Sequence, residues 1–123
     1  MTRLSRHFDT EEFDSPDGAV MPLEWARYLP SLCRLYLEPL RRAYGPVTIN
    51  SGFRSPEHNH RVGGARLSMH MHVRGRRGCA ADVTCRRGTA DDWWHFLRQL
   101  DPPGLGRYPG FVHIDTRDGR ARW

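Results

Sequence analysis

The segment 111–116 most constrains the fold of this chain, because its side chains alternate between apolar and polar. Successive side chains of a β-strand point to opposite faces, so Val112 and Ile114 are expected on one face. His113 and Asp115 then share the other face. The apolar pair predicts burial against a core, and the polar pair predicts a face that opens onto a site. We therefore expect a strand with one covered face and one face open to a site. The alternative for a single histidine in a strand is an ordinary surface or core position.

Glycine and proline divide the rest of the chain into short elements. Apolar residues recur at helical spacing from 22 to 44, where Pro30 and Pro39 are expected to kink or break the helix. Further helices are expected at 8–13, from Pro56 to before Gly63, and from 90 to about 100, and strands at 47–54, 80–84, 105–108, 111–116 and 121–123. Helices followed by interleaved short strands predict an α+β fold with flanking helices and a small, mostly antiparallel sheet.

The length of 123 residues predicts a single domain over 1–123 with one modest core. Hydrophobic residues make up 38% and charged residues 27% of the chain, as in globular proteins. The chain has no apolar stretch of about 18 residues, so no membrane span is predicted. The N-terminal residues lack the apolar core of a secretory signal. We therefore expect one of three cases. The chain remains in the cytoplasm, is exported by a route that its sequence does not reveal, or has had a leader removed.

The net charge is +5, and all 19 basic residues are arginine. A basic surface attracts nucleic acid, anionic lipid or an anionic cell wall, or simply maintains solubility, and composition leaves these open. The run Glu57–His60 superficially resembles a His-Asn-His nuclease motif. The residues of that motif lie far apart along a ββα unit, however, so we predict no nucleic-acid partner. The cysteines include no Cys-x-x-Cys pair, which argues against a zinc ribbon.

His70 and Asp82 add two possible metal ligands to His113. Asp82 lies between Ala81 and Val83 in an apolar strand, where a carboxylate is costly to bury unless it is paired or bound to a cation. Two imidazoles and a carboxylate leave one position of a tetrahedral zinc ion for water, which is the arrangement of a catalytic zinc site. The alternative is that Asp82 caps a turn or pairs with one of the many arginines.

Arg54 follows the run 51–53 at the end of a predicted strand and precedes a helix start. A guanidinium fixed there can hold a carboxylate through two parallel hydrogen bonds. The alternative, in a chain this rich in arginine, is an ordinary solvated side chain.

Several motifs in one order resemble the M15 zinc peptidases. This group contains D-Ala-D-Ala carboxypeptidases and peptidoglycan endopeptidases, and it shares its fold with the Hedgehog signalling domain. The similar segments are 51–59, 62–65, 68–70, 78–82 and 106–117, with further similarity at 4–8, 12–13 and 120–123. The resemblance covers nearly the whole chain and implies a Hedgehog/DD-peptidase-like fold.

By this resemblance, zinc is held by His70, Asp82 and His113, and Arg54 binds a carboxylate of the substrate. The implied activity is zinc-dependent hydrolysis of D-amino-acid-containing bonds in peptidoglycan stem peptides or cross-links, by a D,D-carboxypeptidase or an endopeptidase. The role would be cell-wall lysis, as in endolysins, or remodelling. The expected partner is a peptidoglycan peptide, bound by a monomer that reaches the cell wall by export or phage release.

The chain departs from the family pattern between the first two ligands. The family usually runs Ser-x-His-x-x-Gly-x-Ala-x-Asp, whereas here the segment 71–77 separates His70 from Gly78. A longer loop can still close a metal site, because added loop length costs little. His72 is therefore an alternative ligand, although the upstream Ser68 favours His70.

A second departure concerns the general base. Well-studied members carry an acid three residues before the last zinc histidine, and here that position is Gly110. Asp115 is the predicted catalytic substitute, because it shares a strand face with His113. It could instead hydrogen-bond a ligand histidine and orient it. Without a base, the alternative function is a catalytically inactive zinc module that binds cell wall or a protein partner.

Overall fold

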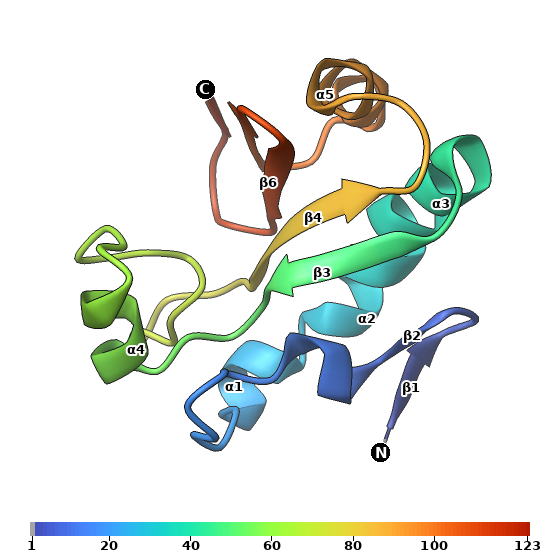
Figure 1. The fold of residues 1–123 in the computed structure, drawn as a ribbon. Coiled ribbons are helices and arrows are strands. Elements are labelled where there is room, and N and C mark those ends of the chain that lie inside the picture. Colours follow the sequence, from blue (N-terminus) through green and yellow to red (C-terminus); the bar gives the residue numbers. More distant parts are fainter. Residues whose placement is uncertain (1) are drawn as a thin grey trace.

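A computed structural model describes residues 2–123, so Met1 of the predicted domain lies outside the described residues. Its main feature is a five-stranded sheet (Figure 1). The strand order is β3 (Val47–Ser51), β4 (Ala80–Cys85), β6 (Phe111–Asp115), β5 (Gly104–Tyr108) and β7 (Ala121–Arg122). Neighbouring strands are antiparallel except β5 and β7, which are parallel. The predicted α+β class and mostly antiparallel sheet are confirmed.

The helical segment predicted for 22–44 is divided into four pieces. They are α1 (Leu23–Ala26), α2 (Leu29–Leu32), the π-helical turn η2 (Cys33–Leu37) and α3 (Glu38–Tyr44). Pro30 and Pro39 each lie in the first turn of a piece, where the missing N–H costs no internal hydrogen bond. The two prolines therefore mark breaks, as predicted. No helix among the described residues is long and apolar enough to cross a membrane.

The other two α-helices begin where their capping residues predict. In α4 (Pro56–Arg61), the Ser55 hydroxyl accepts a hydrogen bond from the His58 N–H at 3.0 Å. In α5 (Ala90–Leu100), Thr89 caps the first turn by accepting from the Asp92 N–H at 3.3 Å. Such caps satisfy N–H groups that have no partner inside the helix.

The N-terminal segment contains a hairpin that the sequence pattern did not indicate. Its strands β1 (Arg3–Ser5) and β2 (Phe8–Asp9) are 3 and 2 residues long, too short for alternation to be recognised. The 3-10 helix η1 (Thr10–Phe13) follows, in place of the helix predicted for 8–13. The hairpin packs near α2 and η2 (Figure 1).

The strand predicted for 47–54 ends earlier, at Ser51. Beyond it, the Phe53 N–H donates to the carbonyl of Phe13 at 2.7 Å, and the Arg54 N–H donates to the carbonyl of His70 at 2.8 Å. These hydrogen bonds replace the ladder to β4 and turn the chain toward α4. The early end of β3 therefore joins Arg54 to the loop that carries His70.

Asp17 holds the N-terminal loop against the start of α4. Its carboxylate accepts hydrogen bonds from the hydroxyls of Ser55 and Ser15. These hydrogen bonds, with that from Ser55 the largest cause, lower the pKa of Asp17 to about 2. The capping residue of α4, which directly follows Arg54, is thus anchored by a distant part of the chain.

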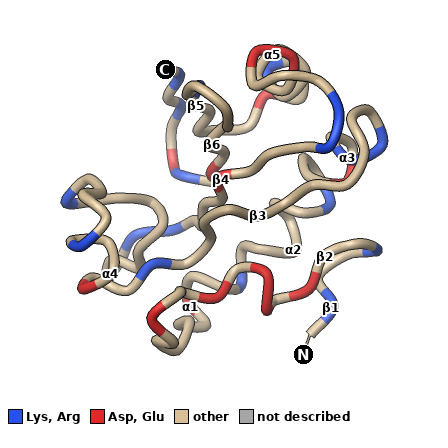
Figure 2. Tube along the Cα trace, viewed as in Figure 1, with Lys and Arg blue, Asp and Glu red and all other residues tan. Residues whose placement is uncertain are grey.

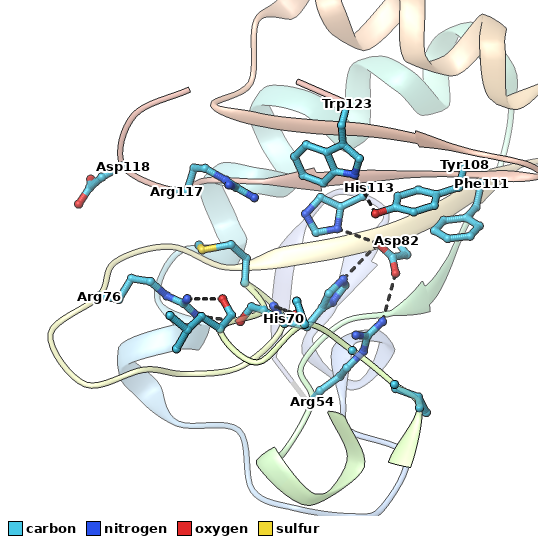
Figure 3. A pocket seen from close by; sticks show the side chains of 17 residues that line it. Arg54, His70, Arg76, Asp82, Tyr108, Phe111, His113, Arg117, Asp118 and Trp123 are labelled. Atoms are coloured by element: carbon cyan, nitrogen blue, oxygen red, sulfur yellow. Dashed lines mark hydrogen bonds and ion pairs between the residues drawn. The ribbon is translucent and has the colours of Figure 1, made fainter. Parts of the chain in front are cut away.

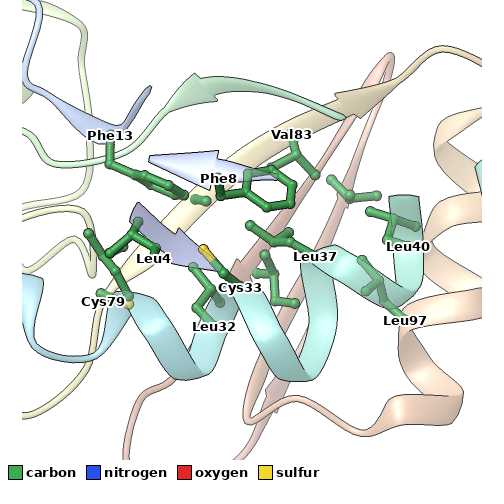
Figure 4. Packing of buried hydrophobic residues seen from close by; sticks show 14 of the residues in the cluster. Leu4, Phe8, Phe13, Leu32, Cys33, Leu37, Leu40, Cys79, Val83 and Leu97 are labelled. Atoms are coloured by element: carbon green, nitrogen blue, oxygen red, sulfur yellow. The ribbon is translucent and has the colours of Figure 1, made fainter. Parts of the chain in front are cut away.

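The core lies between the sheet and the helices (Figure 4). Val112 and Ile114 are fully buried, which confirms the apolar face predicted from alternation. Leu37 of η2 and Leu97 of α5 pack in the same cluster with Val83 of β4. The helices therefore cover one face of the sheet and leave the face of His113 for a site.

A matched pair of leucines on α5 tests this core. Leu97 is fully buried, whereas Leu100 is 37% exposed. Leu97→Ala should lower the free energy of unfolding by about 2–5 kcal/mol, because it leaves a cavity in packed surroundings. Leu100→Ala should cost less than about 1 kcal/mol. Urea unfolding followed by circular dichroism measures both, and equal losses would contradict this packing.

Candidate metal centre

Three side chains from separate segments converge on the open face of the sheet (Figure 3). His70 comes from the loop after α4, Asp82 from β4 and His113 from β6. One possible ligand atom from each lies within 4.8 Å of the other two. Nε2 of His70 is 3.1 Å, and Nδ1 of His113 is 2.9 Å, from the same oxygen, Oδ1 of Asp82. The structure thus brings together the three residues that the sequence predicted as metal ligands.

Sheet register places two of these three residues. Asp82 and His113 are directly opposite each other in the β4–β6 ladder. Side chains of opposite residues in an antiparallel pair project from the same face and lie close together. Any register shift by one residue would turn one of the two side chains into the core.

His70 is oriented by a backbone carbonyl. Its Nδ1 lies 2.7 Å from the oxygen of Gly52, which can only accept a hydrogen bond. Nδ1 therefore carries the hydrogen, and Nε2 presents a lone pair to Asp82. Burial lowers the pKa of His70 and outweighs the opposing effect of Asp82, so the neutral ring is favoured.

His113 is oriented by Asp115. Its Nε2 lies 2.7 Å from Oδ2 of Asp115, which is fully buried. The Arg117 guanidinium also donates to Asp115, from Nε at 2.9 Å and from Nη2 at 2.7 Å. Burial alone would raise the pKa of Asp115, but hydrogen bonds from His113 and Arg117 outweigh it and hold the pKa well below its usual value. Both carboxylate oxygens are thus engaged behind the ligand ring. This environment favours the orienting role for Asp115 over the role of general base.

The arrangement of His70, Asp82 and His113 favours a bound cation. With Nδ1 of His70 and Nε2 of His113 donating elsewhere, two neutral rings would point lone pairs at one oxygen of Asp82. For His113, burial lowers the pKa, but the hydrogen bonds with Asp115 and Asp82 more than offset this and raise it. A proton on His113 or a bound metal ion relieves the repulsion. Two imidazole nitrogens and one carboxylate oxygen fit zinc, with a fourth position free for water.

Arg54 lies beside the centre and is held in place. Its Nε donates to the Ser51 hydroxyl at 3.0 Å, and its Nη1 donates to Oδ1 of Asn59 at 3.2 Å. Nη2 reaches Oδ2 of Asp82 at 3.4 Å, the oxygen that faces away from the two histidines. The side chain is 16% exposed, so it is not an ordinary solvated arginine. Gly64 leaves room for it, since a Cβ there would lie 2.8 Å from Nη1.

The centre opens into a cavity of about 660 Å³. Arg54 lines it together with His70, Asp82 and His113, whereas Asp115 does not reach it. Tyr108 and Trp123 also line this cavity, and neither was predicted as a site residue. Alternation along β5 could have placed Tyr108 on the face of His113. Trp123 reaches the cavity only because β7 pairs with β5.

The inserted segment 71–77 folds back on the loop that carries His70. The guanidinium of Arg76 donates to the carbonyls of Leu67 at 2.6 Å, Ser68 at 2.7 Å and Met71 at 2.9 Å. These contacts lie on both sides of His70 along the chain. The insertion therefore holds its own loop closed, and the first ligand can still meet Asp82.

Other residues weighed as functional lie outside the converged group. His72 is partly exposed and is not a member of it. His58 and His60 lie on α4, and they are likewise outside the group. Gly110 lies at the tip of the β5–β6 hairpin with a φ of +89°. That backbone conformation favours glycine, so the hairpin geometry suits the loss of the usual acid at this position.

Comparison with known proteins gives one match. A family model described as Peptidase M15 matches residues 5–115. The matched range contains Arg54, His70, Asp82 and His113, and it ends before Arg117 and Trp123. Neither the curated proteins nor the solved structures give a match.

Replacing His70 and His72 one at a time tests which of them is a metal ligand. His70→Ala should abolish stoichiometric zinc binding, because His70 contributes one of the three converging lone pairs. His72→Ala should leave zinc binding unchanged, since His72 lies outside the group. Zinc per chain after dialysis, measured by mass spectrometry, distinguishes the two. Zinc lost in the His72 variant and kept in the His70 variant would reverse the assignment.

Asp115→Asn tests the orienting carboxylate. The replacement removes the charge that holds His113, so zinc affinity should fall about 10- to 100-fold. Asp118→Asn is the matched control, because Asp118 is exposed at the rim of the same cavity. Competition with a chelator measures zinc affinity in both variants. Unchanged affinity in Asp115→Asn would show that Asp115 does not support the metal centre.

Proposed function

The chain belongs to the peptidase M15 family, and from this we propose that it is a zinc-dependent peptidase acting on peptidoglycan. The proposed substrates are D-amino-acid-containing peptide bonds of stem peptides or cross-links. The observation that carries the proposal is the convergence of His70, Asp82 and His113 within 4.8 Å at a cavity that Arg54 also lines. A cavity of about 660 Å³ is large enough for a short peptide.

The chain's own residues prepare this centre for a metal. The Gly52 carbonyl and Asp115 fix the tautomers of the two histidines, so each turns a lone pair inward. Asp82 adds one negative charge, which would leave a bound zinc ion with a net charge of about +1. Zinc in such a site polarises a carbonyl and makes a bound water more acidic.

Arg54 is the proposed substrate-binding residue. Its guanidinium is immobilised by Ser51 and Asn59, so it can hold a peptide carboxylate without first being ordered. A carboxylate held there would set the distance between the scissile carbonyl and Asp82, which Arg54 also contacts. Positioning of this kind contributes to the rate by bringing reacting groups together before the reaction.

A metal-binding module without catalytic activity is the second candidate. It is favoured by Gly110, which replaces the acid that the family resemblance leads one to expect. Among the described residues, the carboxylates that line the cavity are Asp82 and the exposed Asp118. Such a module would keep zinc and bind a wall peptide without cleaving it.

The cell wall is the proposed place of action, reached by export or phage release. The net charge of +5 suits an anionic wall. Basic residues are spread over α3, α4, the loop after α4 and the C-terminal strands (Figure 2). Several acidic residues lie along the N-terminal segment. The attraction would therefore be diffuse rather than directed by one patch.

Peptides with free and amidated C-termini test the role of Arg54. The zinc-loaded chain should hydrolyse a peptide ending in D-Ala-D-Ala and should lose activity with His113→Ala. If Arg54 binds the terminal carboxylate, Arg54→Gln should lower kcat/KM for the free peptide about 10- to 100-fold and change little for the amidated one. Mass spectrometry of the products identifies the bond.

The control for this experiment is Arg61→Gln, which removes a 62% exposed arginine on the neighbouring helix. Zinc content is measured in every variant, because Arg54 also contacts Asp82. Bound zinc without hydrolysis of any stem peptide or cross-linked peptide would favour the binding module. An equal loss on free and amidated peptides would contradict carboxylate recognition by Arg54.

A further inference from the structure

We propose that the phenolic hydroxyl of Tyr108 is a catalytic hydrogen-bond donor in this cavity. It would stabilise the oxygen of the scissile carbonyl as that oxygen gains negative charge. The inference rests on the proposed function, because it presupposes peptide hydrolysis beside His113 and Asp82. No bond forms or breaks at Tyr108 in this role, so the hydroxyl keeps its proton throughout.

Strand register places Tyr108 on the same face as His113. In the β5–β6 ladder, Gly106 is opposite His113 and Tyr108 is opposite Phe111. Tyr108 follows Gly106 by two residues, so both project from the face that carries His113. Diagonal neighbours of this kind are about 7–8 Å apart, within reach of an aromatic side chain. Tyr108 accordingly lines the same cavity.

Trp123 occupies the space beside His113 that Gly106 leaves open. A Cβ at Gly106 would lie 2.3 Å from the indole ring, so only glycine admits the indole there. The backbone of Trp123 is tied to β5, because its N–H donates to Leu105 at 3.1 Å and its carbonyl accepts from Arg107 at 2.8 Å. The indole centre is 5.2 Å from the imidazole centre of His113. Trp123 is therefore a fixed neighbour of both the metal centre and Tyr108.

The hydroxyl of Tyr108 is oriented by Trp123. The indole Nε1 lies 2.7 Å from the phenolic oxygen, and an indole N–H can only donate. The phenol is therefore the acceptor in this contact, and its own hydrogen remains available. The Tyr108 ring also stacks on Phe111, with centres 4.6 Å apart and planes 3° apart. Figure 3 shows the oxygen of Tyr108 directed toward the region of His113 and Asp82.

A neutral donor is useful here, because the charged donors that line the cavity are already engaged. Arg54 donates to Ser51, Asn59 and Asp82. Arg76 donates to backbone carbonyls, and Arg117 donates to Asp115. A neutral O–H donor fixed in advance stabilises developing charge without reorganising during the reaction. Tyr108 meets that requirement.

Tyr108→Phe removes the hydroxyl and keeps the ring. Loss of one such donor should lower kcat about 100-fold or more, while KM and zinc affinity stay within about twofold of the wild type. Tyr28→Phe is the matched control, since it removes a hydroxyl that does not line the cavity. Trp123→Phe removes the Nε1 donor and should lower kcat in the same manner but to a smaller extent.

A second readout does not depend on turnover. A phosphinate peptide imitates the tetrahedral, negatively charged form of the scissile group. Calorimetry should show that Tyr108→Phe weakens binding of this phosphinate at least tenfold while leaving the affinity for the parent peptide unchanged, as expected of a donor that acts on the transition state.

The outcomes separate the two proposals. Wild-type kcat and phosphinate affinity in Tyr108→Phe would overturn the role of Tyr108 and leave the peptidase intact. A parallel fall in zinc affinity would assign Tyr108 a structural role and would also overturn the proposal. A wild-type chain that binds zinc but cleaves no peptide would overturn the proposed function, and the role of Tyr108 with it.

Discussion

The buried carboxylate of Asp82 is the constraint on which the site depends. One of its oxygens faces two imidazole nitrogens at 3.1 and 2.9 Å, and the other faces Arg54 at 3.4 Å. Burial alone would raise the pKa of Asp82, but its close contacts with His113 and His70 outweigh it and lower the pKa far below its usual value. A buried negative charge needs positive charge nearby: Arg54 supplies it on one side, and a cation bound between the two rings would supply it on the other.

The surroundings of the site are arranged to keep that geometry. The Gly52 carbonyl fixes His70, and the Asp115–Arg117 pair fixes His113, so each ligand ring is held by its second nitrogen. Gly104 permits the second arrangement, because a Cβ there would lie 2.0 Å from the Asp115 carboxylate. The two ligand rings are thus held by a backbone carbonyl and by a buried ion pair, and the ion pair fits because Gly104 has no side chain.

Much of the fold could be predicted from local patterns. The alternation of 111–115, the Ser55 and Thr89 caps and the two prolines of the long helical segment each depend on neighbouring residues, and each prediction is confirmed. The hairpin at 3–9 and the early end of β3 could not be predicted. Both depend on contacts between distant segments, such as the hydrogen bonds of Phe53 to Phe13 and of Arg54 to His70.

The sequence by itself determined the fold class, the functional strand face and the chemical types of the candidate ligands, because these follow from alternation, spacing and motif. Tertiary structure alone decided what each side chain touches. It placed Asp115 behind His113 rather than in the cavity, used Arg76 to close the inserted loop and brought Trp123 to Tyr108 through the pairing of β7 with β5. The reason is physical: register and loop closure set distances between residues far apart in the chain, and no local pattern records those distances.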